Sequence, residues 1–207
     1  MDARHIMTIG HSTHPAEHLM GLLTQHGVTA VADVRSSPYS RLNPQFNREA
    51  LHAALKVRKI AYVFLGRELG ARSEDPNCYD AGKVQYGRLA QTPEFNQGIA
   101  RVLKGLERYN IALLCSERDP LYCHRTILVS RVLERLGVEV KHIHGDGRLE
   151  KHQDAMRRLL GLVGLPPHDF FRSAEQLLDE AYRMQEDKIA YVDEKQRLVN
   201  TSDATSR

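Results

Sequence analysis

Short apolar runs alternate with longer amphipathic stretches along most of the chain. Five aliphatic runs predict strands, at 5–10, 28–35, 60–66, 110–115 and 138–145. Apolar residues at helical spacing predict helices between and after them, at 15–26, 48–59, 98–109, 121–136 and 148–161. Strands this apolar are typical of a sheet covered by helices on both faces. The alternation therefore predicts a doubly wound, mostly parallel α/β sheet of about five strands, Rossmann-like in class.

Two parts of the chain depart from this alternation. Residues 67–96 form a long connection interrupted by glycine and proline, which is typical of a functional segment or one with small elements of its own. The pattern changes again near Leu165. We expect an α/β domain with a polar cleft over 1–164, a C-terminal helix and short extended segment packed on it over 165–195, and a disordered tail over 196–207.

Composition narrows the class of protein. Apolar residues make up 42% of the chain and charged residues 27%, which is typical of a globular protein. The sequence has no apolar run of membrane-spanning length and no signal-peptide pattern at its start, so we expect a soluble cytoplasmic protein without a membrane partner. A net charge of +3 permits an anionic ligand without requiring one. The sequence implies no particular cofactor and no oligomeric state.

Every predicted strand ends in small or ionisable residues. These ends are Gly10–Ser12, Asp33–Arg35, Leu65–Gly66, Cys115–Glu117 and His144–Asp146. The carboxyl ends of parallel strands meet at one edge of a sheet, where ligands bind in open α/β folds. One cleft could therefore collect all five groups.

Structural alternatives accompany these assignments. Ser12 could cap the following helix instead of contacting a ligand. Asp33 and Arg35 could form a buried ion pair that fixes a loop, although their position after a strand favours a cleft. Cys115 could be a small buried apolar residue. Glu117 is harder to place in a core, because its carboxylate needs water or a partner.

The second half of the stretch "LLCSERDPLYCHR" is predicted to begin a helix. Asp119 is a suitable N-cap and Pro120 a suitable first helical residue, which puts Cys123, His124 and Arg125 in the first turns. Cationic side chains there oppose the helix dipole, at a cost of up to about 1 kcal/mol each. That cost is easier to explain if an anion binds nearby, or if both side chains pair with acidic residues.

The cysteines permit several chemistries. An odd count of three argues against a disulfide framework. Seven residues separate Cys115 from Cys123, unlike the tight cysteine pairs of structural zinc sites, so we predict no metal and keep a metal or thiol site as a lesser alternative, with His11 as a possible further ligand. A phosphatase-like loop is disfavoured because Pro120 lacks an N–H and Arg125 comes too late. A Cys123 thiolate nucleophile remains a further alternative.

The loop after the second predicted strand mixes aromatic and basic residues. Tyr39 and Phe46 accompany Arg35, Arg41 and Asn43. Aromatic rings beside arginines suit stacking on a base and contact with phosphates. Alternatively, the aromatic rings pack into the domain.

Five motifs together resemble the family named domain of unknown function 488 (DUF488). They are "TIGHSTHPAEHLMGLL", "DVRSSPYSRLNPQFN", "YVFLGRELGAR", "LLCSERDPLYCHR" and "AYRMQEDKIAY", and the resemblance spans residues 6–192. It implies an α/β fold and a shared polar site, but no established activity. The matching positions are His11, Ser12, Asp33, Arg35, Pro38, Ser40, Phe46, Tyr62, Leu69, Gly70, Cys115, Glu117, Cys123, His124 and Arg125.

The first functional hypothesis is a hydrolase or transferase acting on an anionic nucleotide or nucleic-acid substrate. Arg35 and Arg125 would hold phosphate. Asp33 or Glu117 would act as nucleophile or general base, and a pair of carboxylates would suit cleavage of a glycosidic bond, with a phosphoester as the other option.

Histidine has a role in the first hypothesis, and two further hypotheses use the same residues differently. His11 or His124 would transfer protons near neutral pH. The second hypothesis is a binding or sensor module that recognises a nucleotide or nucleic acid in the same cleft without chemistry. The third is a thiol or metal site at Cys115 and Cys123.

Overall fold

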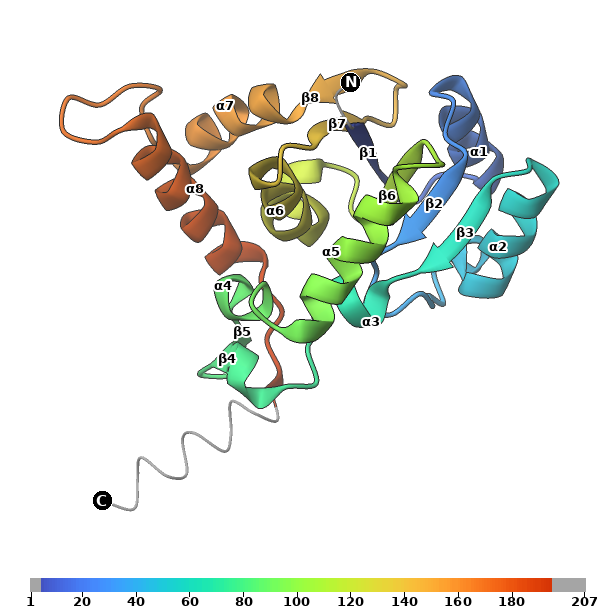
Figure 1. Cartoon of the computed structure of the whole chain (residues 1–207), viewed down its shortest axis with the longest axis horizontal. Helices are drawn as coiled ribbons and strands as arrows, with labels where there is room; N and C mark the ends of the chain where they lie inside the picture. The colour runs from blue at the N-terminus through green and yellow to red at the C-terminus, as the bar shows by residue number, and fades with distance from the viewer. Residues whose placement is uncertain (1–4, 195–207) are drawn as a thin grey trace, which may run out of the picture.

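The computed structural model describes residues 5–194, so the predicted tail at 196–207 lies outside the described residues. Six strands form the central sheet in the order β3-β2-β6-β1-β7-β8, and every neighbouring pair is parallel except β7 with β8 (Figure 1). The strands are β1 (His5–Gly10), β2 (Ala30–Asp33), β3 (Ala61–Phe64), β6 (Ile111–Cys115), β7 (Glu139–Ile143) and β8 (Leu149–Lys151). The predicted doubly wound, mostly parallel α/β class is confirmed.

Helices cover both faces of this sheet. One apolar core lies under α1 (Ala16–Gln25) and α2 (Arg48–Val57). The larger core lies on the other face, under α5 (Pro93–Gly105), α6 (Arg131–Arg135) and α7 (His152–Val163). The C-terminal helix α8 (Ala174–Ile189) packs against α7 (Figure 1).

The predicted helix at 121–136 is wrong at its start. Asp119 caps only a short 3-10 helix, η3 (Pro120–Tyr122), through a bond from the Leu121 N–H at 2.9 Å. Cys123 is extended, and wide π-type turns, η4 (Arg125–Ser130), lead into α6. The sequence pattern marked the apolar face of this segment, but did not show that the backbone opens at Cys123.

A second correction concerns 149–151, which was predicted as helix and is the strand β8. This strand pairs antiparallel with β7, so the segment completes the edge of the sheet before α7 begins.

The long connection contains small elements. These are α3 (Gly66–Leu69), the 3-10 helix η2 (Pro76–Cys78), the hairpin β4 (Tyr79–Asp80) and β5 (Lys83–Val84), and α4 (Tyr86–Leu89). The last described residues run beside this hairpin. The Val84 N–H donates to the Tyr191 carbonyl at 2.9 Å, and the Asp193 N–H donates to the Gly82 carbonyl at 2.7 Å.

Strand order places a crevice at the carboxyl end of β6. This strand lies between β1 and β2, but the helix that follows it packs on the face opposite α1 and α2. Adjacent strands whose connections leave to opposite faces open a crevice between their ends.

A glycine at the end of β1 lets the chain approach closely there. A Cβ on Gly10 would lie 1.7 Å from the Glu117 carbonyl oxygen, so β1 can meet the β6 loop only if this position has no side chain.

Within residues 5–194, the helices are all too short or too polar to cross a bilayer.

Candidate functional site

A cavity of about 220 Å³ opens at the carboxyl ends of β2 and β6, and we call it the β6 pocket. Five of the predicted site residues line it: Arg35, Cys115, Glu117, Cys123 and His124. The structure therefore brings together residues that lie far apart in the sequence, and it places the stretch "LLCSERDPLYCHR" along one wall.

Asp33 and Arg35 form a buried ion pair next to this pocket. The Arg35 guanidinium donates to both carboxylate oxygens of Asp33, at 2.8 and 2.6 Å. Arg35 also donates to the Phe46 carbonyl at 2.9 Å, and the Tyr62 hydroxyl donates to Asp33 at 2.9 Å. Asp33 is fully buried, so its carboxylate and the guanidinium are engaged with each other and with the loop.

His11 lies behind this pair and does not line the β6 pocket. Its Nδ1 lies 2.7 Å from the Ser12 carbonyl and its Nε2 lies 3.3 Å from an Arg35 nitrogen. Burial lowers the pKa of His11 to about 4, although the bond to Ser12 opposes the shift. His11 is therefore neutral near pH 7, with its proton on Nδ1, because a carbonyl can only accept.

The loop after β2 gives its aromatic residues other roles. Phe46 is buried and stacks on the His11 ring, with centroids 4.4 Å apart, so neither face of its ring is free for a base. Tyr39 is exposed and donates to Glu49 at 2.8 Å, outside the pocket. The Ser40 hydroxyl oxygen accepts two backbone N–H groups at 3.2 Å and shapes the turn.

Ser12 and Arg125 also contact backbone. The Ser12 N–H donates to the Ser116 carbonyl at 2.9 Å, which ties the ends of β1 and β6 together. Arg125 is fully buried and donates to the Glu117 carbonyl at 2.8 Å, under the loop that carries this carboxylate. The guanidinium thus supports the pocket from below instead of facing into it.

Two thiols and an imidazole converge on the floor of the β6 pocket. The His124 Nδ1 lies 3.7 Å from the Cys115 Sγ and 3.9 Å from the Cys123 Sγ. The other ring nitrogen, Nε2, lies 3.0 Å from the Val34 carbonyl. All three side chains are buried, and the three cysteines of the chain are free thiols.

The two thiols differ in acidity. Burial alone would raise the pKa of Cys123, but the hydrogen bond from Cys115 and the Arg125 guanidinium outweigh it and lower that pKa well below its ordinary value. The pKa of Cys115 rises well above its ordinary value, because of its hydrogen bond with Cys123 and its burial. Cys123 is therefore the more acidic of the two thiols.

Glu117 is the single carboxylate among the described residues that line the pocket. Its Oε2 accepts a hydrogen bond from the Cys115 Sγ at 3.3 Å. Loss of water around the carboxylate raises the pKa of Glu117 above its ordinary value, and the negative charge of Cys123 is the second cause of this increase. This carboxyl can therefore exchange a proton closer to neutral pH than a solvated glutamate can.

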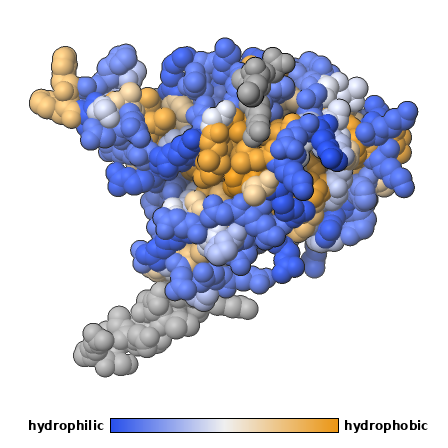
Figure 2. Space-filling view, viewed as in Figure 1, coloured by the Kyte–Doolittle hydropathy of each residue, from blue (hydrophilic) through white to orange (hydrophobic). Residues whose placement is uncertain are grey.

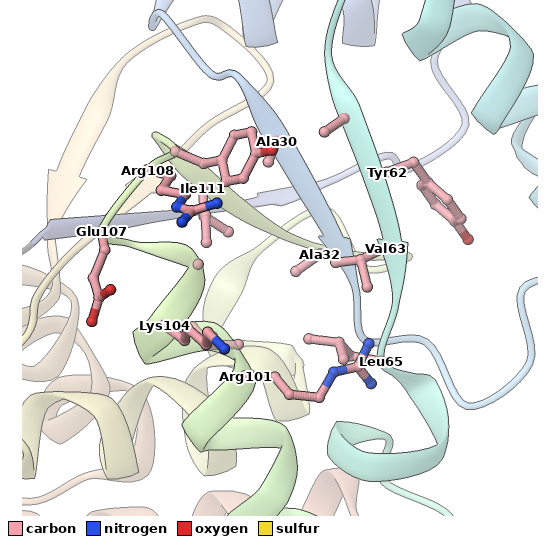
Figure 3. Close-up of a pocket in the computed structure, with 14 residues that line it drawn as sticks. Ala30, Ala32, Tyr62, Val63, Leu65, Arg101, Lys104, Glu107, Arg108 and Ile111 are labelled. Carbon is pink, nitrogen blue, oxygen red and sulfur yellow. The ribbon is translucent and has the colours of Figure 1, made fainter.

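Two larger cavities among the described residues can be compared with the β6 pocket. One of about 710 Å³ adjoins the β6 pocket, since both are lined by Ser36 and Arg72. The other, of about 650 Å³, lies between β2, β3 and α5, and small apolar side chains with a basic rim line it (Figure 3). Tyr62 is the one predicted site residue that lines the cavity of about 650 Å³. We therefore place the candidate site at the β6 pocket.

A family model described as "Domain of unknown function DUF488" matches residues 15–132, which is more than half of the 207 residues. The chain belongs to the DUF488 family. The match includes the ends of β2 and β6, and so every pocket residue from Arg35 to His124. No curated protein and no solved structure matches the chain.

The β6 pocket also contains residues that the sequence did not assign to a site, among them Ser36, Arg72, Tyr86, Tyr122, Ile189 and Tyr191. Arg72 and Tyr86 come from the long connection, and Arg72 also ends the motif "YVFLGRELGAR". Ile189 and Tyr191 lie beyond the matched region, at the end of α8 and just after it. Both belong to the motif "AYRMQEDKIAY", but that motif did not assign them to the pocket, because only the docking of α8 brings them to β6.

Proposed function

We propose that this chain is an enzyme, a hydrolase or transferase, that acts on an anionic nucleotide or nucleic-acid substrate in the β6 pocket. One observation carries the proposal. The Glu117 carboxylate, with its raised pKa, lies in a cavity at the end of β6 with the Cys123 thiol, whose pKa is lowered, and His124 beside it. Groups of this kind in a cleft are what general acid–base catalysis needs.

The proposed anion contact is Arg72. Its side chain is exposed at the mouth of the pocket, and its guanidinium lies 4.4 Å from the centroid of the Tyr191 ring. Its backbone N–H donates to the Ser36 hydroxyl at 3.1 Å, which fixes the chain where the two cavities meet. Arg35 and Arg125 are occupied by internal partners, so Arg72 is the better candidate to bind a phosphate.

The size of the site supports an extended substrate. The β6 pocket, at about 220 Å³, is smaller than an ordinary ligand site of about 300–1,000 Å³. The adjoining cavity of about 710 Å³ adds room on the other side of Arg72. The Tyr122 ring is half exposed at the pocket, where a base could stack on it.

Cleavage by a pair of carboxylates is not the mechanism that the geometry supports. Asp33 is fully buried and bound to Arg35, so it cannot act on a substrate together with Glu117. We therefore assign the acid–base role to Glu117 alone, and regard the Asp33–Arg35 pair as the support of the pocket wall.

The test compares Glu117→Gln with Arg72→Ala against a panel of mono- and oligonucleotides. Glu117→Gln should lower turnover by about 10²–10⁴-fold while binding stays within a few-fold of the unmodified protein, because the amide keeps the shape but cannot transfer the proton. Arg72→Ala should weaken binding and flatten its dependence on salt. Arg41→Ala, an exposed arginine outside the pocket, is the matched control and should change neither.

A binding or sensor module is the second candidate, favoured by the engagement of Asp33, Arg35 and His11 in internal contacts. It predicts nucleotide binding without turnover in the unmodified protein. Weaker nucleotide binding in Glu117→Gln, with no turnover by the unmodified protein, would also support it over the enzyme.

A further inference from the structure

Three side chains of types that bind metal ions lie close together at the floor of the β6 pocket. The Cys115 Sγ, the Cys123 Sγ and the His124 Nδ1 all lie within 4.8 Å of one another. We propose that these three atoms bind a zinc ion, or another thiophilic divalent cation, with a fourth coordination position open to the pocket.

The distances fit a tetrahedral site. With zinc–sulfur bonds of about 2.3 Å and zinc–nitrogen bonds of about 2.1 Å, a ligand sulfur and a ligand nitrogen lie about 3.6 Å apart. The two sulfur–nitrogen distances here are 3.7 and 3.9 Å. The two sulfurs lie within 4.8 Å of each other, against about 3.8 Å between two ligand sulfurs in such a site, so shifts of up to about one ångström would complete the coordination.

The orientation of His124 fits a ligand. Its Nε2 lies 3.0 Å from the Val34 carbonyl, which can only accept, so Nε2 carries a proton. In the neutral ring, Nδ1 then has its lone pair directed toward the two sulfurs. A histidine that donates one N–H to a backbone carbonyl and offers the other nitrogen is typical of metal sites.

Charge favours a cation here. Two thiolates buried side by side would repel each other. A divalent cation would neutralise both thiolates at once. Thiolate and imidazole ligands select zinc and similar soft cations over magnesium or calcium, which prefer oxygen.

The neighbouring carboxylate indicates what such an ion would do. Three protein ligands with an open fourth position are typical of catalytic zinc, which lowers the pKa of its bound water to about 7. Glu117, with its Oε2 3.3 Å from the Cys115 Sγ, is placed to accept a proton from that water. This last assignment rests on the proposed function, whereas metal binding does not.

The experiment measures metal directly on the full-length protein, purified without chelator and without a histidine tag. Elemental analysis should find about one equivalent of zinc per chain. After chelation and thiol reduction, titration with Co²⁺ should produce a thiolate-to-cobalt charge-transfer band and the visible bands of tetrahedral cobalt, both lost when zinc is added.

Variants assign the ligands. Cys123→Ser and His124→Gln should each weaken zinc binding by about 100-fold or more, because loss of a coordinating atom weakens binding more than loss of a residue that only orients a ligand. Cys78→Ser is the matched control, because Cys78 is also a buried free thiol but does not line the pocket, and its zinc affinity should stay within about two-fold. Circular dichroism of each variant checks the fold, and release of zinc from the unmodified protein by a thiol-modifying reagent gives a second readout.

Three results would overturn the proposal: folded, reduced protein that gives no cobalt spectrum, a Cys115–Cys123 disulfide that forms in place of the metal site, or equal effects of Cys78→Ser and Cys123→Ser. If zinc binds but no nucleotide is turned over, the proposed function fails and the metal site stands. If turnover persists after the metal is removed, the metal site has no part in the reaction.

Discussion

The Arg35 guanidinium meets both oxygens of Asp33 in a position with almost no access to water. Breaking a buried ion pair leaves one charge uncompensated and costs about 3–5 kcal/mol. A phosphate could bind Arg35 only by displacing Asp33, so the pair fixes the loop that ends at Phe46 instead. Arg35 thus lines the pocket while internal partners hold its guanidinium.

Gly10 is the residue on which the meeting of β1 and β6 depends. In Gly10→Ala the new Cβ would overlap the Glu117 carbonyl oxygen, 1.7 Å away, and that atom is backbone held by Arg125. We expect the variant to lose several kcal/mol of stability, at the upper end of the range of about 0.5–3 kcal/mol for ordinary substitutions or beyond it. Urea denaturation measures the loss.

The control is Gly21→Ala in α1, where a Cβ would meet nothing within 4 Å. Alanine is the better helix former by about 1 kcal/mol, so this variant should match or exceed the stability of the unmodified protein. Similar stability of both alanine variants would show that β1 does not need its close approach to the β6 loop.

A buried polar chain joins four elements on one side of the sheet. It runs from Thr8 on β1 to His142 on β7 at 2.8 Å, to His152 on α7 at 3.0 Å, and to Tyr182 on α8 at 2.9 Å. Burial lowers the pKa of His142 well below its ordinary value and that of His152 to about 4. Helices α7 and α8 therefore pack against the sheet through hydrogen bonds of neutral imidazoles. Protonation of these imidazoles in acid should weaken this packing.

Stability should fall as the pH drops from about 6.5 to about 4. Unfolded histidine takes up a proton near pH 6.5, whereas folded His152 resists it until about pH 4, so acid favours the unfolded chain. The shift corresponds to about 3 kcal/mol for His152, to which His11 adds in the same range. Glu134, 3.7 Å from His152, has its pKa raised by burial, so it takes up its proton sooner in the folded chain and offsets part of this loss toward the acid end of the range.

Urea denaturation at a series of pH values measures this slope. His152→Gln should lose part of the acid sensitivity, while His52→Gln, on the exposed face of α2, should keep all of it. Identical slopes for the two variants would mean that the buried chain does not limit the packing of α7 and α8.

At the scale of the whole molecule, the C-terminal segment closes the β6 pocket. Ile189 and Tyr191 line it from the far end of the chain, and the strand β5 of the long connection holds this segment in place. The long connection and the C-terminal segment thus decide how far the pocket is open. The apolar tip between α7 and α8, with Phe170 and Phe171 exposed, extends away from the body of the molecule (Figure 2).

Removal of this cover should expose the thiols. In Tyr191→Ala, the Cys115 and Cys123 thiols of chelated, reduced protein should react with iodoacetamide several-fold faster, as followed by mass spectrometry. Phe170→Ala removes an aromatic ring that is fully exposed, and should leave the rates unchanged. Unchanged rates in Tyr191→Ala would mean that access to the pocket does not pass the C-terminal segment.

The sequence by itself determined the class of fold and the edge of the sheet that holds the site. Apolar runs of strand length between amphipathic stretches have few other solutions, and parallel strands send their ends to one edge. The motifs around Asp33, Cys115 and His124 therefore lie at the end of the sheet where the β6 pocket opens. The predicted helices were wrong at Cys123, where the backbone is extended, and at 149–151, which forms β8. Apolar periodicity does not show where a helix is interrupted or where an edge strand is added.

Only the tertiary structure decided which polar residues face the pocket. Asp33, Arg35 and Arg125 look like site residues in the sequence, but burial and pairing make them supports. The cysteine spacing argued against a metal site, yet the folded loop 116–122 brings both sulfurs to one histidine nitrogen. Distance along the chain does not limit distance in space once a loop folds back, which is why the donor set became visible only in three dimensions.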